Sequence, residues 1–330
     1  MGRYFARRLL AMIPTFLGIT FITLAIAHLA PGDPYAAQAD ILRGGAMNRN
    51  AALEFRKIMH LDDPLPVQWA TWVRRIVTLD FDRSLRTGRP VLDMMVGALP
   101  PTLLVAGAAF FVAYLIAIPL GILSATRSGG LADRATSAIL FALYSLPNFW
   151  VAVSLMLFLG GGGRGKYPMI FPIQGLTTQE VWAQGGFALV RDVAWHLVLP
   201  VACLAYGLLA SVSRYMRTGM LEVIRQDYIR TARAKGLSEW AVVMKHALRN
   251  SILPIVTLVG LMLPYLVGGT VVIEEIFGIP GMGQLTFVAI HNRDYPVIMA
   301  VTSLTAVITM LAVLATDVLY SIVDPRIRYR

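Results

Sequence analysis

The sequence predicts an all-α membrane protein with six transmembrane helices and with both termini in the cytoplasm. Three observations predict this fold class: the composition, the number of long apolar segments and the placing of positive charge. Of the 330 residues, 57% are hydrophobic and 15% are charged, whereas soluble domains are about 45–50% apolar and about 25% charged. The mean hydropathy is +0.64. This composition favours a chain embedded in a bilayer.

Six apolar segments are each long enough to cross a bilayer, which takes about 20 helical residues. They are nearly free of charge and contain the Gly and Pro that membrane helices tolerate. The segments run over 9–29, 99–125, 135–159, 194–213, 252–273 and 297–319. The first follows three arginines, as a secretory signal would, but its apolar run exceeds the roughly 7–15 residues of a signal core. We therefore expect an uncleaved anchor.

The distribution of Lys and Arg predicts the orientation, because cytoplasmic loops carry an excess of both. With the N-terminus inside, the inner pieces hold 16 of the 29 Lys and Arg residues and the two short outer loops hold 4. The remaining 9 lie in the long loop 30–98, where charge has little effect on orientation. The inner pieces are 1–8, 126–134, 214–251 and 320–330, and the short outer loops are 160–193 and 274–296.

The chain divides into three predicted parts. Residues 1–30 form an N-terminal cytoplasmic segment with the first transmembrane helix, and residues 31–98 form an external loop. Residues 99–330 form a core of five transmembrane helices that contains the cytoplasmic loop 214–250.

The external loop has the pattern of two short helices, over 51–60 and 66–79. Trp69, Trp72 and Val73 share one face of the second helix. They can pack against the outer ends of the spans or rest at the membrane interface. The loop as a whole is either a structural layer or a lid or docking surface.

The stretch LGGGGRGKY, residues 159–167, places Gly160, Gly165 and Lys166 at the spacing of a phosphate-binding loop. That loop needs Ser or Thr after the lysine and a helix that begins there. Tyr167 and Pro168 follow instead, so we expect a flexible turn.

The usual catalytic patterns are absent from the sequence. The one cysteine, Cys203, lies in an apolar stretch, and neither H-E-x-x-H nor G-x-S-x-G occurs. We expect no catalytic residue, no metal site and no cofactor bound by this chain. The net charge of +10 fits membrane orientation, and nucleic acid is not an expected partner.

The cytoplasmic loop 214–250 predicts a helix, a glycine turn and a second helix. Gly236 is placed to end the first helix in the left-handed conformation, and Ser238 is placed to cap the second. The apolar stripe of the first helix is predicted to be Leu221, Ile224, Tyr228 and Ala232.

This predicted hairpin either docks into another protein or lies on anionic lipid as a basic amphipathic element. Small residues before the turn and apolar residues after it favour docking, with Ala232, Gly236 and Leu237 as the contact core. The full set of candidate contact residues is Tyr228, Arg230, Thr231, Ala232, Arg233, Lys235, Gly236, Leu237 and Trp240.

The loop resembles the EAA loop of ABC-importer permeases, whose pattern is E-A-A-x3-G-x9-I-x-L-P. Only Ala232, Gly236 and Leu248 match that pattern literally. The departures themselves, in the wording YIRTARAKG and HALRN, are similar to the dipeptide/oligopeptide/nickel permease family. The stretches Pro31–Pro34, Pro64–Trp69, Glu275–Gly283, Arg293–Pro296 and Asp324–Arg326 are also similar to that family, in order and along nearly the whole chain. At Leu79–Asp82 the family would have glycines flanking Asp-Phe, so the turn there is in doubt.

The resemblance implies a permease subunit in the cytoplasmic membrane of a prokaryote. Such a subunit pairs with a second, similar permease, docks two cytoplasmic ATPases that use ATP and Mg²⁺, and receives solute from an extracytoplasmic binding protein. The resemblance implies di- or oligopeptides as solutes and leaves nickel chelate and glutathione open. A secondary transporter driven by an ion gradient is the alternative class, together with an intramembrane protease or a lipid-binding scaffold.

Three further predictions concern the spans. Glu274, Glu275, Phe277, Pro280, Gly281 and Gly283 are expected at the outer mouth, as an external gate, a contact for the binding protein or a re-entrant turn. Polar residues of the spans line the path or bond between helices; the candidates for the path are Asn148, Ser211, Thr257 and Thr302. Asp317 is expected to pair with Arg214 or Arg217.

Overall fold

A computed structural model describes residues 2–29, 63–160 and 169–323. These residues are almost entirely helical, and among them the structure has isolated β-bridges but no strand. Four helices are long and apolar enough to cross a membrane: α1 (Gly2–Leu29), α5 (Val91–Thr126), α9 (Gly186–Ile224) and α16 (Tyr295–Val323). The number rises to six if each of two bent helix pairs counts as one span; the pairs are Leu131–Tyr144 with Asn148–Leu159, and Glu239–Ser251 with Pro254–Gly260.

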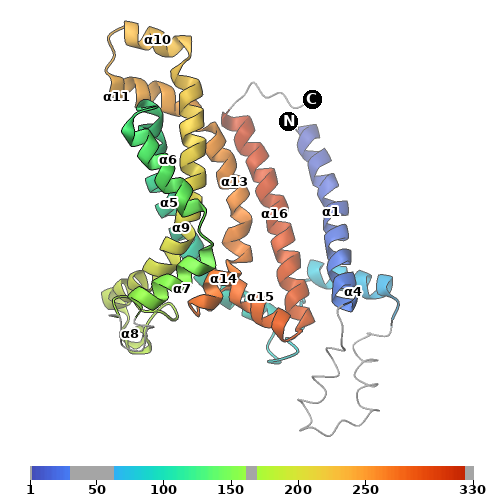
Figure 1. Ribbon diagram of the computed structural model, residues 1–330. Helices are drawn as coiled ribbons and strands as arrows, with labels where there is room; N and C mark the ends of the chain where they lie inside the picture. The colour runs from blue at the N-terminus through green and yellow to red at the C-terminus, as the bar shows by residue number, and fades with distance from the viewer. Residues whose placement is uncertain (1, 30–62, 161–168, 324–330) are drawn as a thin grey trace.

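The third apolar segment, 135–159, is not one straight helix. The structure divides it into α6 (Leu131–Tyr144) and α7 (Asn148–Leu159), which bend by 91°. Pro147 causes the break, because a proline disfavours helical backbone in the residue before it and has no N–H to donate. As a result α7 lies across one end of the bundle (Figure 1).

The fifth segment, 252–273, is divided as well. Helix α13 (Leu253–Gly268) stops at Gly269, which has a φ of 78°, and α14 (Val271–Ile276) begins after it. A left-handed residue ends a helix, and glycine adopts that conformation without steric cost. The short helix α15 (Met282–His291) then leads into α16.

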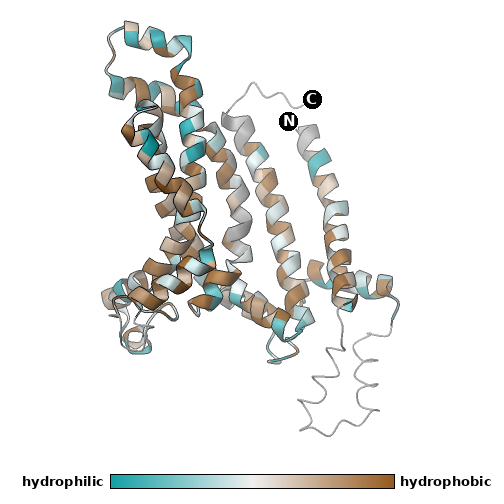
Figure 2. Ribbon diagram, viewed as in Figure 1, coloured by the Kyte–Doolittle hydropathy of each residue, from teal (hydrophilic) through white to brown (hydrophobic). Residues whose placement is uncertain are grey.

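The two ends of the bundle differ in content. One end carries α4 (Leu65–Val77), α7, α8 (Gln179–Gln184), α14 and α15, and the other carries α10 (Asp227–Ala234) and α11 (Glu239–Ala241) (Figure 1). Helix α1 begins and α16 ends at the α10 end. Hydrophobic residues cover much of α1, α7 and α16, while hydrophilic residues are frequent on α10 (Figure 2).

Helices α5 and α9 pack along each other and form the centre of the bundle. Small residues permit a close approach: a Cβ added at Gly121 of α5 would lie 2.6 Å from the Cβ of Met216 on α9. Met216 and Met220 are fully buried there, with Val212. Such tight helix contacts through small residues are typical of membrane bundles.

The predicted partner of Asp317 is wrong. Its Oδ2 lies 2.8 Å from Nε of Arg8, which brings the beginning of α1 against the end of α16. Arg217 bonds to Asp133 of α6 instead. The sequence could not show which helix stands beside the last turns of α16.

The predicted helix 66–79 is confirmed as α4, whereas the predicted helix 51–60 lies outside the described residues. The aromatic face of α4 packs on α1, as one of the two alternatives predicts. Nε1 of Trp69 donates to Oγ1 of Thr20 at 3.1 Å, and Trp72 is buried beside Leu24 and Phe81. The segment after α4 is bonded to the residue that precedes α16: the buried carboxylate of Asp294 accepts from the Leu85 amide at 3.0 Å.

The turn at Leu79–Asp82 keeps a glycine-like backbone without glycine. The φ of Leu79 is 56° and that of Asp82 is 64°, and these are the two positions where the resemblance would place glycines. A non-glycine residue in the left-handed region costs roughly 1–2 kcal/mol. Having Leu79 and Asp82 in place of glycines therefore adds strain to the turn but leaves its backbone shape unchanged.

We predict that Leu79→Gly raises the free energy of unfolding by about 1 kcal/mol, because the change removes this strain and Leu79 is 62% exposed. Thermal unfolding of the purified protein in detergent measures the effect. Leu79→Ala is the matched control, since alanine shortens the side chain and keeps the strain. Equal unfolding temperatures for the two variants would contradict the account of this turn.

Candidate functional site

The hairpin predicted within 214–250 is present and projects from one end of the bundle (Figure 1). Helix α10 ends in a Schellman motif: Gly236, with a φ of 76°, donates to the Arg233 carbonyl at 2.9 Å, and Leu237 donates to the Ala232 carbonyl at 3.4 Å. Ser238 Oγ accepts from the Ala241 amide at 3.4 Å and caps α11. The glycine turn and the serine cap are therefore both confirmed.

The predicted apolar stripe of the hairpin is wrong at Tyr228, whereas Leu221, Ile224 and Ala232 pack in one apolar cluster. Helix α9 ends at Ile224, and Gln226 is extended, with a ψ of 151°, so the stripe does not run on through one continuous helix. In α10 the buried residues are Ile229 and Ala232, whereas Tyr228 is 42% exposed. Ala232 thus packs inside the chain and not on the exposed face of the hairpin.

The second half of the hairpin contains an unusual helix. Val242–Ala247 form a π-helix between α11 and α12 (Leu248–Ser251). Val242 and Ala247 are fully buried in the same cluster as Met216 and Ile229. The hairpin is therefore packed onto the end of α9 by its own apolar core.

The exposed tip of the hairpin carries three large apolar side chains, which we call the tip surface: Tyr228, Leu237 and Trp240. Leu237 is 43% exposed and Trp240 is 75% exposed. The Tyr228 hydroxyl accepts from Nδ2 of Asn250 at 2.7 Å, which fixes its ring. Exposed aromatic residues are enriched at protein interfaces.

The polar residues of the hairpin make contacts among themselves. Arg233 makes a bidentate pair with Glu239, at 2.7 and 3.2 Å, which braces the two arms across the turn. Arg230 lies 3.6 Å from Asp227, Thr231 donates to the backbone of Asp227 at 3.0 Å, and Lys235 is exposed.

At the opposite end of the bundle, the buried carboxylate of Glu274 organises the segment between α13 and α15. Glu274 has no exposed surface. Its Oε1 accepts from the Thr102 hydroxyl and the Thr270 amide, both at 3.0 Å. Its Oε2 accepts from the amides of Gly283 at 2.7 Å and Gln284 at 3.1 Å. Four donors therefore saturate this carboxylate.

The glycines of this segment are needed for close packing around Glu274. A Cβ at Gly281 would lie 2.5 Å from Thr102 Oγ1 and closer still to Glu274 Oε2, and one at Gly283 would lie 2.7 Å from the Val271 amide nitrogen. Phe277 is buried, while Glu275 and Pro280 are exposed. Of the readings given for Glu274 above, this geometry fits the re-entrant turn satisfied by its neighbours.

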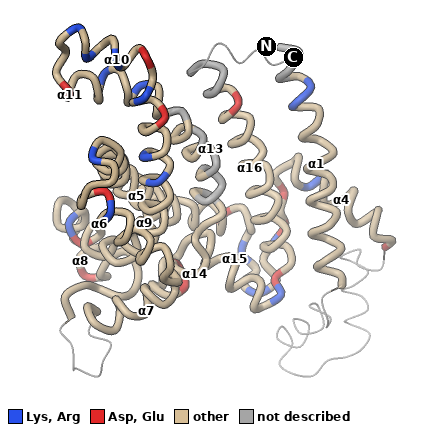
Figure 3. The backbone as a smooth tube through the Cα atoms, turned by 45° about the horizontal axis from the view of Figure 1, so that its top comes forward, with Lys and Arg blue, Asp and Glu red and all other residues tan. Residues whose placement is uncertain are grey.

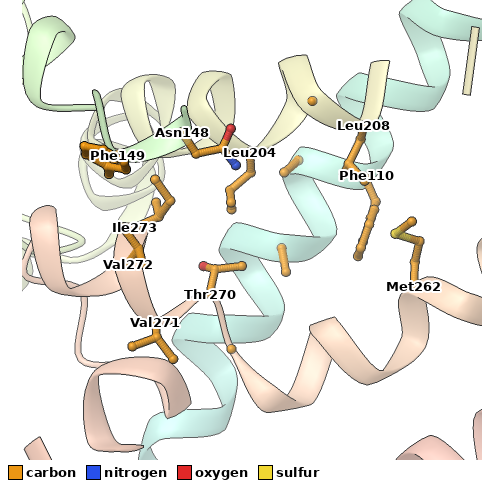
Figure 4. Close-up of a pocket in the computed structure, with 14 residues that line it drawn as sticks. Phe110, Asn148, Phe149, Leu204, Leu208, Met262, Thr270, Val271, Val272 and Ile273 are labelled. Atoms are coloured by element: carbon orange, nitrogen blue, oxygen red, sulfur yellow. The ribbon is translucent and has the colours of Figure 1, made fainter. Parts of the chain in front are cut away.

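A cavity of about 540 Å³ lies between α5, α7, α9 and α13–α14 (Figure 4). Its lining is mostly apolar, with the polar side chains of Asn148 and Thr270. Asn148 was among the predicted path residues, whereas Phe110, Phe149 and Thr270 were not. Only the fold brings these residues together, because they come from helices far apart in the sequence.

Ser211 and Thr302 are not among the residues that line this cavity. The hydroxyl of Ser211 donates to the Gly207 carbonyl at 3.3 Å, and that of Thr302 donates to the Ile298 carbonyl at 2.8 Å. Each thus bonds to its own helix. Thr257 belongs to α13, but its side chain lies outside the described part of the structure.

Two further predictions were that residues 159–167 form a turn rather than a phosphate-binding loop, and that the chain has no metal site. Residues 161–168 of the glycine-rich stretch lie outside the described residues, and Gly160 follows the end of α7. In the described ranges, no three His, Cys, Asp or Glu residues are grouped so that they could hold a metal ion.

We predict that Gly281→Ala destabilises the protein by about 1–3 kcal/mol, because the added methyl group would overlap Glu274 and Thr102 in a packed site. Thermal unfolding in detergent checks this. Gly97→Ala in α5 is the control, since its Cβ would meet nothing within 4 Å. If Gly281→Ala unfolded like Gly97→Ala, the packing around Glu274 would not be as described.

Comparisons with known proteins agree with the resemblance seen in the sequence. Residues 117–329 match the family described as binding-protein-dependent transport system inner membrane component. The chain is 40% identical over 330 residues to the oligopeptide transport system permease protein AppB of Bacillus subtilis (strain 168), covering all of both chains. It is 34% identical over 346 residues to the dipeptide transport system permease protein DppB of Escherichia coli (strain K12), again covering all of both.

The fold also has a solved counterpart. A chain of the MetNI methionine ABC transporter, in an inward-facing conformation, superposes with a TM-score of 0.53 and 20% identity, over 70% of this chain and 96% of that one. That likeness supports the fold alone. The family match and the full-length relatives show more: this chain belongs to the binding-protein-dependent transport system inner membrane components.

Proposed function

We propose that this protein is the permease subunit of an ATP-driven peptide importer and forms half of its translocation path. The observation that carries the proposal is the tip surface, an exposed apolar hairpin end on a chain similar over its full length to oligopeptide and dipeptide permeases. The hairpin is the coupling element for a cytoplasmic ATPase. ATP and Mg²⁺ act in that partner.

In the proposed topology the chain crosses the membrane six times and the α10 end faces the cytoplasm. Support comes from the charge distribution, because Arg and Lys are frequent on α10 and the last turns of α9 (Figure 3). The beginning of α1 and the end of α16 lie at that same end, so both termini would be cytoplasmic. This topology keeps the three predicted parts of the chain: the first span in 1–30, the external loop in 31–98 and the permease core in 99–330.

The proposed path is the cavity beside Asn148, closed on its open side by a second permease of similar fold. Among the lining residues that the structure describes, no side chain is charged, which suits solutes that vary in side-chain charge, such as peptides. Exposed Glu275 and Pro280 mark the outer face where an extracytoplasmic binding protein would deliver the solute. The segment held by Glu274 would separate that face from the cavity.

The alternative of an ion-gradient-driven transporter gains no support from the buried carboxylates. Those of Glu274 and Asp133 each accept four hydrogen bonds, so neither offers an open site for a coupling ion. Alternating access would instead follow the closure of the ATPase pair, transmitted through the hairpin.

We predict that Trp240→Ala abolishes or strongly reduces copurification of the ATPase with the permease, because Trp240 is the most exposed side chain of the tip surface. Truncating an interface aromatic costs about 2 kcal/mol or more, roughly thirtyfold in affinity. The amount of ATPase retained on the affinity-tagged permease measures the effect.

Trp182→Ala is the matched control, because Trp182 is 66% exposed and lies on α8 at the opposite end. It should retain the ATPase fully. Equal retention in Trp182→Ala and Trp240→Ala would refute the assignment of the tip surface.

We predict that Gly236→Val uncouples ATP hydrolysis from uptake, because a β-branched residue cannot readily adopt the φ of 76° that sets the angle between the two arms. Uptake of a labelled dipeptide and ATP hydrolysis are measured together in proteoliposomes. Gly88→Val places the same strain, at a φ of 68°, in an open turn near α5 and should leave the ratio unchanged. A wild-type ratio in Gly236→Val would speak against a rigid hairpin.

A further inference from the structure

Helix α6 is fastened to α9 near the hairpin by a buried ion pair. Asp133, in the first turn of α6, is 5% exposed. Arg217 of α9 donates to both of its oxygens, from Nε at 2.8 Å and from Nη2 at 2.9 Å. The Gly129 amide, at 2.9 Å, and the Ser124 hydroxyl complete the set of donors. This pair is bidentate and fully satisfied, which is the strong form of a charge-assisted bond.

A second polar bond fastens the other end of α6 to the same helix. The hydroxyl of Tyr206 on α9 donates to the Leu146 carbonyl at 2.8 Å, in the bend between α6 and α7. Tyr206 and Arg217 are eleven residues apart on α9, which is about 16 Å along a helix axis. The 14 residues of α6 span about 21 Å. The two bonds therefore hold α6 near both of its ends.

Between these two bonds α6 has little buried surface of its own. Asp133 is its one buried residue, while Leu131, Ile139 and Phe141 are 86%, 59% and 64% exposed. Polar bonds, rather than a large apolar core, thus set its position against α9. Leu146 lies within the predicted span 135–159, where lipid would offer its carbonyl no partner in place of Tyr206.

The bend after α6 places the first residues of α7 in the wall of the cavity. Asn148 and Phe149 are the first residues of α7 and line the cavity with Leu204 and Gly207 of α9. A Cβ at Gly207 would lie 3.9 Å from Oδ1 of Asn148, and Figure 4 shows Asn148 close to Leu204. The Tyr206 bond thus lies beside the cavity wall, while the Arg217 pair lies two turns before the end of α9 at Ile224.

We propose that α6 is a strut that carries the displacement of the hairpin to Asn148 and Phe149, with Arg217 and Tyr206 as the positioning residues that pin it to α9. This inference rests on the proposed function, since the hairpin moves only if an ATPase moves it. Neither residue touches the solute. Each acts by keeping the first turn of α7 in register with α9 when the hairpin shifts.

The test compares four variants of the complete, reconstituted complex. Tyr206→Phe removes the hydroxyl alone, and Arg217→Met removes the ion pair. The controls are Tyr215→Phe and Arg214→Met, which delete the same groups from exposed positions of the same helix. Spin labels at Val153→Cys on α7 and Leu311→Cys on α16, which are 53% and 50% exposed, report the distance between these helices with and without ATP and vanadate.

In the unmodified complex and in both controls, we expect ATP with vanadate to change the distance between the labels. In Tyr206→Phe and Arg217→Met we expect that change to be lost and dipeptide uptake to fall about fivefold or more, with the ATPase still bound at wild-type levels. Retained ATPase shows that the docking site is intact, so that the loss of the distance change can be assigned to α6.

A wild-type distance change and wild-type uptake in Tyr206→Phe would overturn the strut, and this variant decides the question even if Arg217→Met fails to fold because Asp133 is left buried and unpaired. If the unmodified complex retains no ATPase, the proposed function fails first and the strut fails with it.

Discussion

One constraint shapes this structure: where a helix is interrupted, the freed backbone N–H and C=O groups need hydrogen-bond partners within the protein, because lipid supplies none. The chain interrupts its apolar segments twice and meets this need each time with one side chain. At the bend before α7 the Tyr206 hydroxyl binds the exposed carbonyl of Leu146. Between α13 and α15 the carboxylate of Glu274 binds three amides and one hydroxyl.

These two satisfied interruptions place the cavity. The first turns the chain so that Asn148 and Phe149 enter the bundle, and the second brings Thr270 and Ile273 against them from the other side. A continuous helix at either position would have presented none of these residues there. The irregular backbone is therefore what opens this cavity in the bundle, and in membrane proteins backbone outside helices is tolerated where it lines a cavity.

Composition was enough to predict an all-α membrane protein, and short stretches such as YIRTARAKG and Glu275–Gly283 indicated the family it belongs to. The helix-ending Gly236 and the cap at Ser238 were also predictable, because each depends on local backbone chemistry. The bends were not predicted, since both 135–159 and 252–273 are free of charged residues and long enough to span a bilayer. Pro147 and Gly269 carried the signal, but membrane helices tolerate both residue types and α5 contains three prolines without breaking.

The remaining misses have the same origin in three-dimensional packing. The predicted stripe through Tyr228 assumed one continuous helix. The structure has two helices separated at Gln226, and Ile229 rather than Tyr228 is buried. Asp317 pairs with Arg8 because α1 stands beside α16, a neighbour relation that no spacing encodes. Of the candidate path residues whose side chains the structure describes, Asn148 alone lines the cavity, since a hydroxyl in a membrane helix can bond to its own backbone as Ser211 and Thr302 do.

The central claim is that the tip of the hairpin enters a groove of a separate ATP-hydrolysing subunit. A photo-crosslinking amino acid placed at position 240 in living cells tests this most directly, with the same amino acid at position 182 for comparison. The account predicts a crosslink from position 240 to a cytoplasmic nucleotide-binding protein, and none to that protein from position 182. Crosslinks from position 240 to lipid alone, or to a protein outside the cytoplasm, would contradict it.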